Sequence, residues 1–173
     1  MNNLIKYFIR FVLFLFLQVV ILNEVPPLHQ FITPYLYFLF LLWLPFGTKR
    51  ITLTLLGFFT GYTLDLFTNT PGLHAAACTL LGYFRPTILS LLLSQEASEE
   101  FNREPSIGSM GWGPYAFYII SLTFMHHFYL VLLEWLQFGS FGYFLGKVIF
   151  TTLISVLLIF LLELAMNRRK IKR

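Results

Sequence analysis

The sequence predicts an all-α integral membrane protein, a bundle of six transmembrane helices formed by a single domain over residues 1–173. Hydrophobic residues make up 57% of the chain and charged residues only 12%, about half the share that soluble domains carry. Aromatic residues, which are part of this hydrophobic share, make up 19% of the chain. A soluble fold of this size would leave too much of this apolar surface in water. The composition therefore argues against a water-soluble enzyme and against a disordered chain.

Six apolar segments follow one another along the chain, and most approach the length of about 20 residues that a bilayer requires. The first segment has a basic start like a signal peptide, but no small-x-small cleavage pattern follows, so we interpret it as a retained span. The second is short, begins at Pro34 and is closed by Pro45. The predicted spans cover residues 5–22, 34–46, 51–67, 73–93, 114–138 and 141–166.

The basic residues predict the orientation of these spans. Lys6 and Arg10 lie near the N-terminus, and Lys49 and Arg50 lie in the second loop, whereas the first, third and fifth loops have no Lys or Arg. Five of the last six residues are also basic: Arg168, Arg169, Lys170, Lys172 and Arg173. By the positive-inside rule both termini are expected in the cytoplasm. The net charge of +4 is thus a topology signal and does not indicate nucleic-acid binding.

A polar cytoplasmic loop, residues 95–113, separates the fourth and fifth spans. Its one basic residue is Arg103. Its four acidic residues are Glu96, Glu99, Glu100 and Glu104. Two interpretations remain open, a docking surface for a basic partner or a solvated extension of the helix.

Asp65 is an acidic residue inside the third span. Gly57, Gly61 and Asp65 are spaced by four residues, so they share one face of a helix. Small residues at this spacing allow a neighbouring helix to approach closely. We therefore expect a packed groove that ends at the carboxylate.

Two further sets of charged residues fall within the spans. Arg85 precedes Pro86 in the fourth span, and its side chain is expected either to snorkel to the cytoplasmic interface or to reach Asp65. Glu134 and Lys147 lie on the last two spans near the outer side. They are expected to form a structural ion pair that braces this helical hairpin.

No catalytic or metal-binding motif is present in the sequence. His126 and His127 are adjacent, so their side chains point about 100° apart on a helix, and no H-E-x-x-H pattern includes them. Cys78 is the only cysteine and has no activating neighbour in the sequence. We expect no enzyme activity, no metal and no cofactor, and we interpret both histidines as packing or hydrogen-bonding residues.

The stretch from Gly57 to Ala77 resembles the signature of the rod shape-determining family MreD. In that family a glycine-containing third span ends in an aspartate, here Asp65, and a short turn with a glycine opens the next helix. The segment Asn69-Thr-Pro71-Gly72, followed by Arg85-Pro86, resembles the form found in Bacteroidetes.

The resemblance implies a non-enzymatic, multi-pass subunit of the cell-elongation complex in the bacterial inner membrane. Such a subunit binds MreC, a single-span periplasmic protein, and acts with MreB, RodA and a penicillin-binding transpeptidase. Its role is to support lateral peptidoglycan synthesis and so regulate cell shape. The residues expected to bind the partner or organise the bundle are Gly57, Gly61, Asp65, Gly72, His74 and Arg85.

The family fold is similar to the substrate-binding S component of energy-coupling-factor transporters, and this supplies an alternative function. Four polar residues in the outer half of the spans could line a vitamin site: Asp65, His74, Glu134 and Lys147. The proteins that co-purify with the chain would distinguish the two functions.

Overall fold

The computed structural model describes residues 3–24, 32–93, 102–138 and 140–171, in which helices and turns are present and strands are not. Within these ranges, five helices are long and apolar enough to cross a membrane, so the chain is an all-α, multi-pass membrane protein. They are α1 (Asn3–Phe16), continued by the π-helix η1 (Leu17–Leu22), α3 (Arg50–Thr68), α4 (Leu73–Leu92), α7 (Trp112–Phe138) and α8 (Phe141–Ile171).

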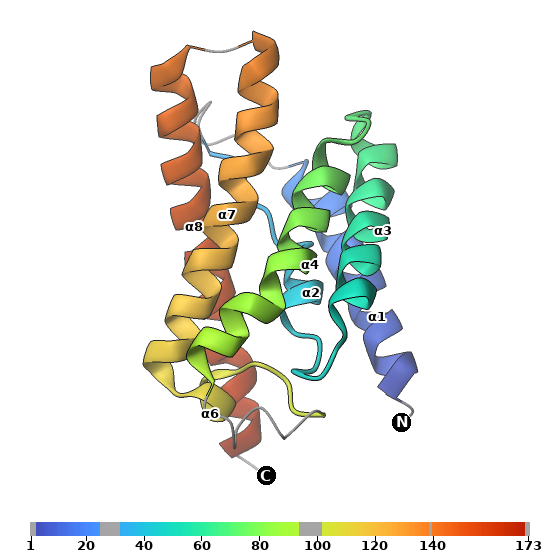
Figure 1. The fold of residues 1–173 in the computed structure, drawn as a ribbon, viewed down its shortest axis with the longest axis vertical. Helices are drawn as coiled ribbons and strands as arrows, with labels where there is room; N and C mark the ends of the chain where they lie inside the picture. Colours follow the sequence, from blue (N-terminus) through green and yellow to red (C-terminus); the bar gives the residue numbers. More distant parts are fainter. Residues whose placement is uncertain (1–2, 25–31, 94–101, 139, 172–173) are drawn as a thin grey trace.

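The long helices run roughly along one axis of the molecule (Figure 1). In space, α4 packs between α3 and α7, and α8 packs on α7. Both marked chain ends lie at one end of the bundle, called here the termini end (Figure 1). The α3–α4 and α7–α8 turns lie at the opposite end, called here the turn end (Figure 1).

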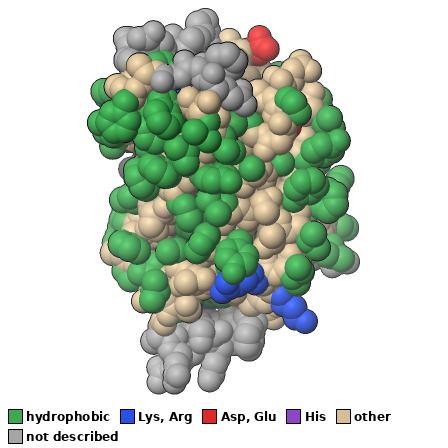
Figure 2. All heavy atoms as spheres, turned by 45° about the horizontal axis from the view of Figure 1, so that its top comes forward, with side chains coloured by type: hydrophobic (Ala, Val, Ile, Leu, Met, Phe, Trp, Pro, Cys, Tyr) green, Lys and Arg blue, Asp and Glu red, His purple; other side chains and the backbone are tan. Residues whose placement is uncertain are grey.

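Large apolar side chains cover the outside of the bundle. Leu4, Phe8 and Leu91 are 74%, 66% and 74% exposed. On the face shown in Figure 2, hydrophobic side chains cover the middle of the molecule and Lys and Arg side chains gather towards one end. This distribution is expected of a protein whose solvent is lipid, because lipid chains solvate exposed Leu and Phe.

Helices α3 and α4 form the most tightly packed pair of the bundle. A Cβ atom built on Gly57 or Gly61 of α3 would lie less than 3.0 Å from backbone atoms of α4. Gly82 of α4 has the same relation to the backbone of Leu53. Real Cβ atoms essentially never come so close, so each of these glycines permits the contact between the two backbones.

The second predicted span is not a continuous helix. Residues 34–46, called here the central segment, contain only the four-residue helix α2 (Leu39–Leu42) between irregular stretches. Nevertheless every residue from Tyr35 to Leu44 is at most 7% exposed. The segment runs through the interior from the turn end to the termini end (Figure 1). Non-helical backbone at membrane depth is tolerated only when protein surrounds it, and here it does.

The polar loop is described from residue 102 onward, so the acidic residues Glu96, Glu99 and Glu100 lie outside the described residues. Beyond it, α6 (Ile107–Met110) begins with a capping box in which Ser106 and Ser109 exchange hydrogen bonds with each other's backbone N–H groups. Of the predicted C-terminal basic residues, Lys172 and Arg173 also lie outside the described residues, and only the backbone of Arg168, Arg169 and Lys170 is described.

Candidate functional site

Asp65 lies near the end of α3 and gathers five hydrogen-bond donors. Its Oδ1 accepts from the backbone N–H of His74 at 2.9 Å, from His74 Nδ1 at 2.9 Å and from the Thr70 hydroxyl at 3.0 Å. Its Oδ2 accepts from the N–H groups of Gly72 at 3.1 Å and Ala75 at 2.9 Å. The residue is 3% exposed. We call Asp65, Thr70, Gly72, His74 and Ala75 the aspartate knot.

The backbone of the α3–α4 turn places these donors around the carboxylate. Asn69 adopts a left-handed conformation with φ of 54°, and Gly72 follows with φ of 86°. Gly72 is the N-cap of α4 and has no side chain to satisfy the first N–H groups of that helix. Asp65 satisfies them from the preceding helix, so one carboxylate both caps α4 and fixes the hairpin.

His74 connects the aspartate knot to the interior. Because a carboxylate only accepts hydrogen bonds, the contact with Asp65 assigns the proton to Nδ1. The His74 ring makes edge contacts with Tyr35 and Tyr37 of the central segment, with ring centroids 5.6 Å apart in both cases. The knot therefore also holds the part of the central segment nearest the turn end.

His126 and His127 are fully buried on α7 and also contact the central segment. Nε2 of His126 lies 2.9 Å from the Tyr37 hydroxyl and 3.7 Å from Cys78 Sγ. The His127 ring stacks on Tyr35. Both histidines thus have packing and hydrogen-bonding positions. Within the described residues no group of three His, Cys, Asp or Glu side chains is arranged to hold a metal.

Arg85 neither snorkels nor pairs with Asp65. It is fully buried, and its guanidinium donates to the carbonyl oxygens of Leu42 at 3.4 Å, of Pro45 at 3.5 Å and of Leu44. Its Nε donates to the Tyr118 hydroxyl at 2.8 Å, which in turn donates to the Leu42 carbonyl at 2.8 Å. Leu42 ends the short helix α2, and Leu44 and Pro45 follow it, so Arg85 replaces the hydrogen bonds that a continuous helix would supply.

Gln18 and Ser155 hold the other end of the central segment, and sequence reasoning missed both. Oε1 of Gln18 accepts from the N–H of Leu36 at 2.8 Å, and its Nε2 donates to the Pro34 carbonyl at 3.1 Å. Ser155 Oγ accepts from the N–H of Tyr35 at 3.1 Å. Gln18 is the only uncharged polar side chain in residues 5–22, which is a signal that sequence analysis can use.

Glu134 and Lys147 form an ion pair between α7 and α8, apart from the aspartate knot. Glu134 and His74 also line a cavity of about 440 Å³ at the turn end, together with Thr70 and Tyr35. The structure therefore brings Asp65, Gly72 and His74 into one cluster. It places Arg85 and the Glu134–Lys147 pair elsewhere.

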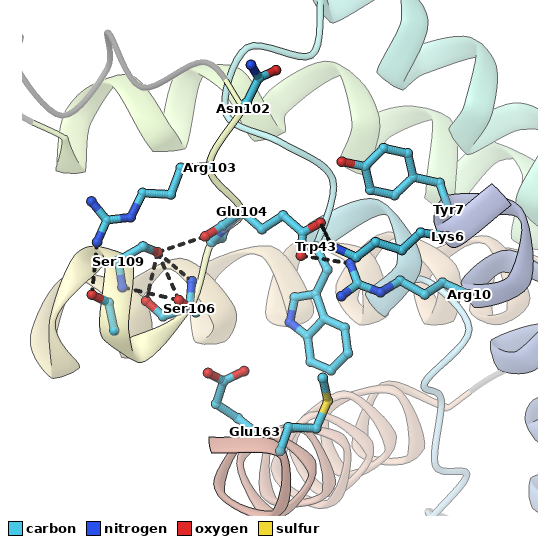
Figure 3. Close-up of a pocket in the computed structure, with 13 residues that line it drawn as sticks. Lys6, Tyr7, Arg10, Trp43, Asn102, Arg103, Glu104, Ser106, Ser109 and Glu163 are labelled. Atoms are coloured by element: carbon cyan, nitrogen blue, oxygen red, sulfur yellow. Dashed lines mark hydrogen bonds and ion pairs between the residues drawn. The ribbon is translucent and has the colours of Figure 1, made fainter. Parts of the chain in front are cut away.

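A second polar cluster lies at the termini end (Figure 3). The Glu104 carboxylate accepts from Lys6 Nζ at 2.5 Å and from Arg10 Nη1 at 2.9 Å, which ties the loop before α6 to α1. Because Glu104 is already paired with α1, it does not offer a free acidic surface to a basic partner. The other acidic residues of the predicted docking surface are outside the described residues.

The Glu104 pairing makes the stability of the fold depend on pH. Burial raises the pKa of Glu104, but the hydrogen bonds from Lys6 and Arg10 lower it further than burial raises it, and the net pKa lies below its ordinary value. The contribution of Glu104 to stability is therefore complete above the unfolded-state pKa of about 4.3 and is lost as the pH falls through the lower folded-state pKa.

We expect Glu104→Gln to lower the unfolding temperature in detergent at neutral pH. The unfolding temperatures of wild type and variant should converge as the pH is lowered. A difference in unfolding temperature that stays constant with pH would contradict the role of the Glu104 carboxylate.

Comparison of the chain with known protein families, with curated proteins and with solved structures finds no match.

Proposed function

We propose that the chain is a non-enzymatic, MreD-like subunit of the cell-elongation complex, located in the bacterial inner membrane with both termini in the cytoplasm. In this proposal the central segment counts as the second of six crossings, and the fold is of the S-component type. The subunit binds an MreC-like partner with a single membrane span and acts with MreB, RodA and a penicillin-binding transpeptidase. It thereby supports lateral peptidoglycan synthesis.

The aspartate knot is the observation that carries this proposal. The residues of the sequence signature, Gly61, Asp65, Gly72 and His74, meet in one cluster rather than lying scattered along two helices, and all but Gly72 are buried in it. Such a cluster determines how α3 and α4 are oriented, which is a task for a scaffold. Both carboxylate oxygens of Asp65 are engaged by donors of the same hairpin, and this favours a structural role over chemistry on a substrate.

The partner helix packs on a surface other than the glycine face of α3. Gly57 and Gly61 already contact α4, so their groove is filled from within the chain. The first span, Leu4–Leu22, is the least covered of the five, with only 17% of its most apolar 18 residues buried. In the proposal its outward face is the surface on which the single span of the partner packs.

Affinity purification from native membranes in mild detergent tests the proposal. We expect a single-span periplasmic coiled-coil protein to co-purify together with a cell-wall synthase. A matched sample carries Phe8→Ala in the outward face of α1, where 66% of the Phe8 side chain is exposed, and it should retain less partner. Recovery of neither protein from a folded sample would contradict the proposal.

One observation favours the alternative, a vitamin-binding S-type subunit of an energy-coupling-factor transporter. The cavity of about 440 Å³ at the turn end is large enough for a small ligand, and His74, Glu134 and Thr70 line it. If this function is correct, the same purification should instead yield a pair of ATPases and a large coupling subunit. A Glu134→Gln variant would then lose ligand uptake.

A further inference from the structure

A cavity of about 460 Å³ lies at the termini end, between α1, the loop before α6 and α8. Figure 3 shows side chains from all three parts of the chain around it, with Trp43 of the central segment between Glu163 and the pair Lys6 and Arg10. Its described lining includes three cationic and two anionic side chains: Lys6, Arg10, Arg103, Glu104 and Glu163. A cavity of mixed charge differs from a simple anion site.

Glu163 is the carboxylate on one side of this cavity. It is 7% exposed and accepts from the N–H of Ile107 at 3.3 Å and from the Tyr115 hydroxyl at 3.1 Å. Among the side chains that the structure describes, no cation lies within ion-pair distance of it. Buried carboxylates are normally paired with a cation, and a carboxylate has about four acceptor positions, so Glu163 can accept further donors.

The cationic side of the cavity keeps donors as well. Lys6 and Arg10 each direct one hydrogen bond to Glu104. An ammonium has three N–H donors and a guanidinium has five, so both side chains can also bind phosphate oxygens. The Lys6 side chain is 36% exposed and is open to a ligand.

The cavity lies at the level where lipid headgroups are found. Lys6 is two residues inside the apolar span Leu4–Leu22, and Glu163 is three residues from the end of the span Phe141–Met166. At 1.5 Å per residue both lie within about 5 Å of the apolar boundary. The Trp43 indole lines the cavity with the Arg10 guanidinium 5.7 Å from its ring centroid. Trp side chains are typical of the membrane interface.

We propose that this cavity binds the headgroup of a zwitterionic phospholipid with a primary ammonium, of the phosphatidylethanolamine class. The lipid phosphate contacts Lys6 and Arg10, and the ammonium donates to Glu163. Phosphatidylcholine has the same charges but no N–H donor for the buried carboxylate. Phosphatidylglycerol carries the phosphate without a cation for Glu163. The site is separate from the aspartate knot, and its occupancy does not depend on the proposed partner.

Native mass spectrometry of the full chain tests the proposal. The protein is purified in detergent and incubated with equal amounts of the three lipids, which have identical acyl chains. We expect wild type to bind phosphatidylethanolamine about tenfold better than phosphatidylcholine, because only the former places charged hydrogen bonds on Glu163. In Glu163→Gln the ratio of bound phosphatidylethanolamine to bound phosphatidylcholine should fall to about one. A matched control, Glu24→Gln, changes an exposed carboxylate at the turn end and should keep the wild-type ratio.

If Glu163→Gln fails to fold, the relative binding of the three lipids to the wild-type protein still tests the proposal. Equal binding of phosphatidylethanolamine and phosphatidylcholine would overturn the proposal, and so would tighter binding of phosphatidylglycerol, which would indicate a simple anion site. An unchanged ratio in a folded Glu163→Gln protein would also overturn it. A second variant, Lys6→Gln, should weaken binding of all three lipids, since each carries the phosphate.

Discussion

A Gly61→Ala protein is expected to lose about 3 kcal/mol of its free energy of unfolding, at the upper end of the usual cost of overpacking. The new methyl group would meet backbone atoms of His74 and Ala75 at less than 3.0 Å. Backbone cannot rotate away as a flexible side chain can, so α3 and α4 must separate. Separation also lengthens the hydrogen bonds of the aspartate knot, which lies one helical turn further along α3.

Thermal unfolding of the purified protein in mild detergent measures this loss. Gly142→Ala is the matched control, because Gly142 is also in a helix and a Cβ built on it meets nothing within 4 Å. The control should melt at or slightly above the wild-type temperature, since Ala is the better helix former. Equal melting temperatures for the two variants would refute the close approach of α3 and α4.

An Asp65→Asn protein is expected to lose a similar amount, about 3 kcal/mol, although the side chains have the same shape. Both oxygens of Asp65 accept from protein N–H groups. An amide NH₂ would face three donors in the place of Oδ1 or two in the place of Oδ2, and the His74 imidazole would lose its carboxylate. The buried N–H groups at the start of α4 that face the NH₂ would then be without an acceptor.

The unfolding temperature in detergent tests this effect, with amide exchange at Gly72, His74 and Ala75 as a local readout. Exchange should accelerate at these three amides more than in α8. Glu24→Gln, which changes an exposed carboxylate, serves as the control and should leave both measurements unchanged. Wild-type stability of a folded Asp65→Asn protein would mean that the carboxylate is incidental.

The α3–α4 hairpin shows what local sequence can predict. Gly57, Gly61 and Asp65 are spaced by one helical turn, and this spacing places them on one face whatever else the chain does. The partner of that face was not predictable in the same way, because Gly82 lies on another helix and meets Leu53 only after the hairpin forms. Similarly, the backbone N–H groups of Gly72, His74 and Ala75 reach Asp65 only through the conformation of the turn.

The central segment shows why the prediction of a second helix over residues 34–46 was wrong. Hydropathy reports burial, and the segment is indeed buried, but hydropathy does not distinguish burial in lipid from burial in protein. The segment has thirteen residues, fewer than the about 20 of a typical transmembrane helix, and this length already argues against a continuous helix. The role of Arg85 was mistaken for the same reason, since its carbonyl partners become free only if this segment is not a continuous helix.

The loop at the termini end was the least predictable part of the candidate sites. Glu104 lies in an acidic sequence that suggests a solvent-facing surface, yet its partners are Lys6 and Arg10, nearly one hundred residues earlier. Glu163 lies three residues before the end of the span Phe141–Met166, and this position indicates only that it is near an interface. That it lines a cavity opposite two cations depends on how α1 and α8 come together, which no local pattern in the sequence reports.

The central segment also has a consequence for the order of biogenesis. Its backbone relies on acceptors and donors that are synthesised much later, namely Arg85, Tyr118 and Ser155, the last of which lies 120 residues after Tyr35. While the ribosome is still making α4 and α7, these polar groups need water or the insertion machinery to satisfy them. We therefore expect the segment to reach its buried position only after α4, α7 and α8, which follow it in the sequence, are in place.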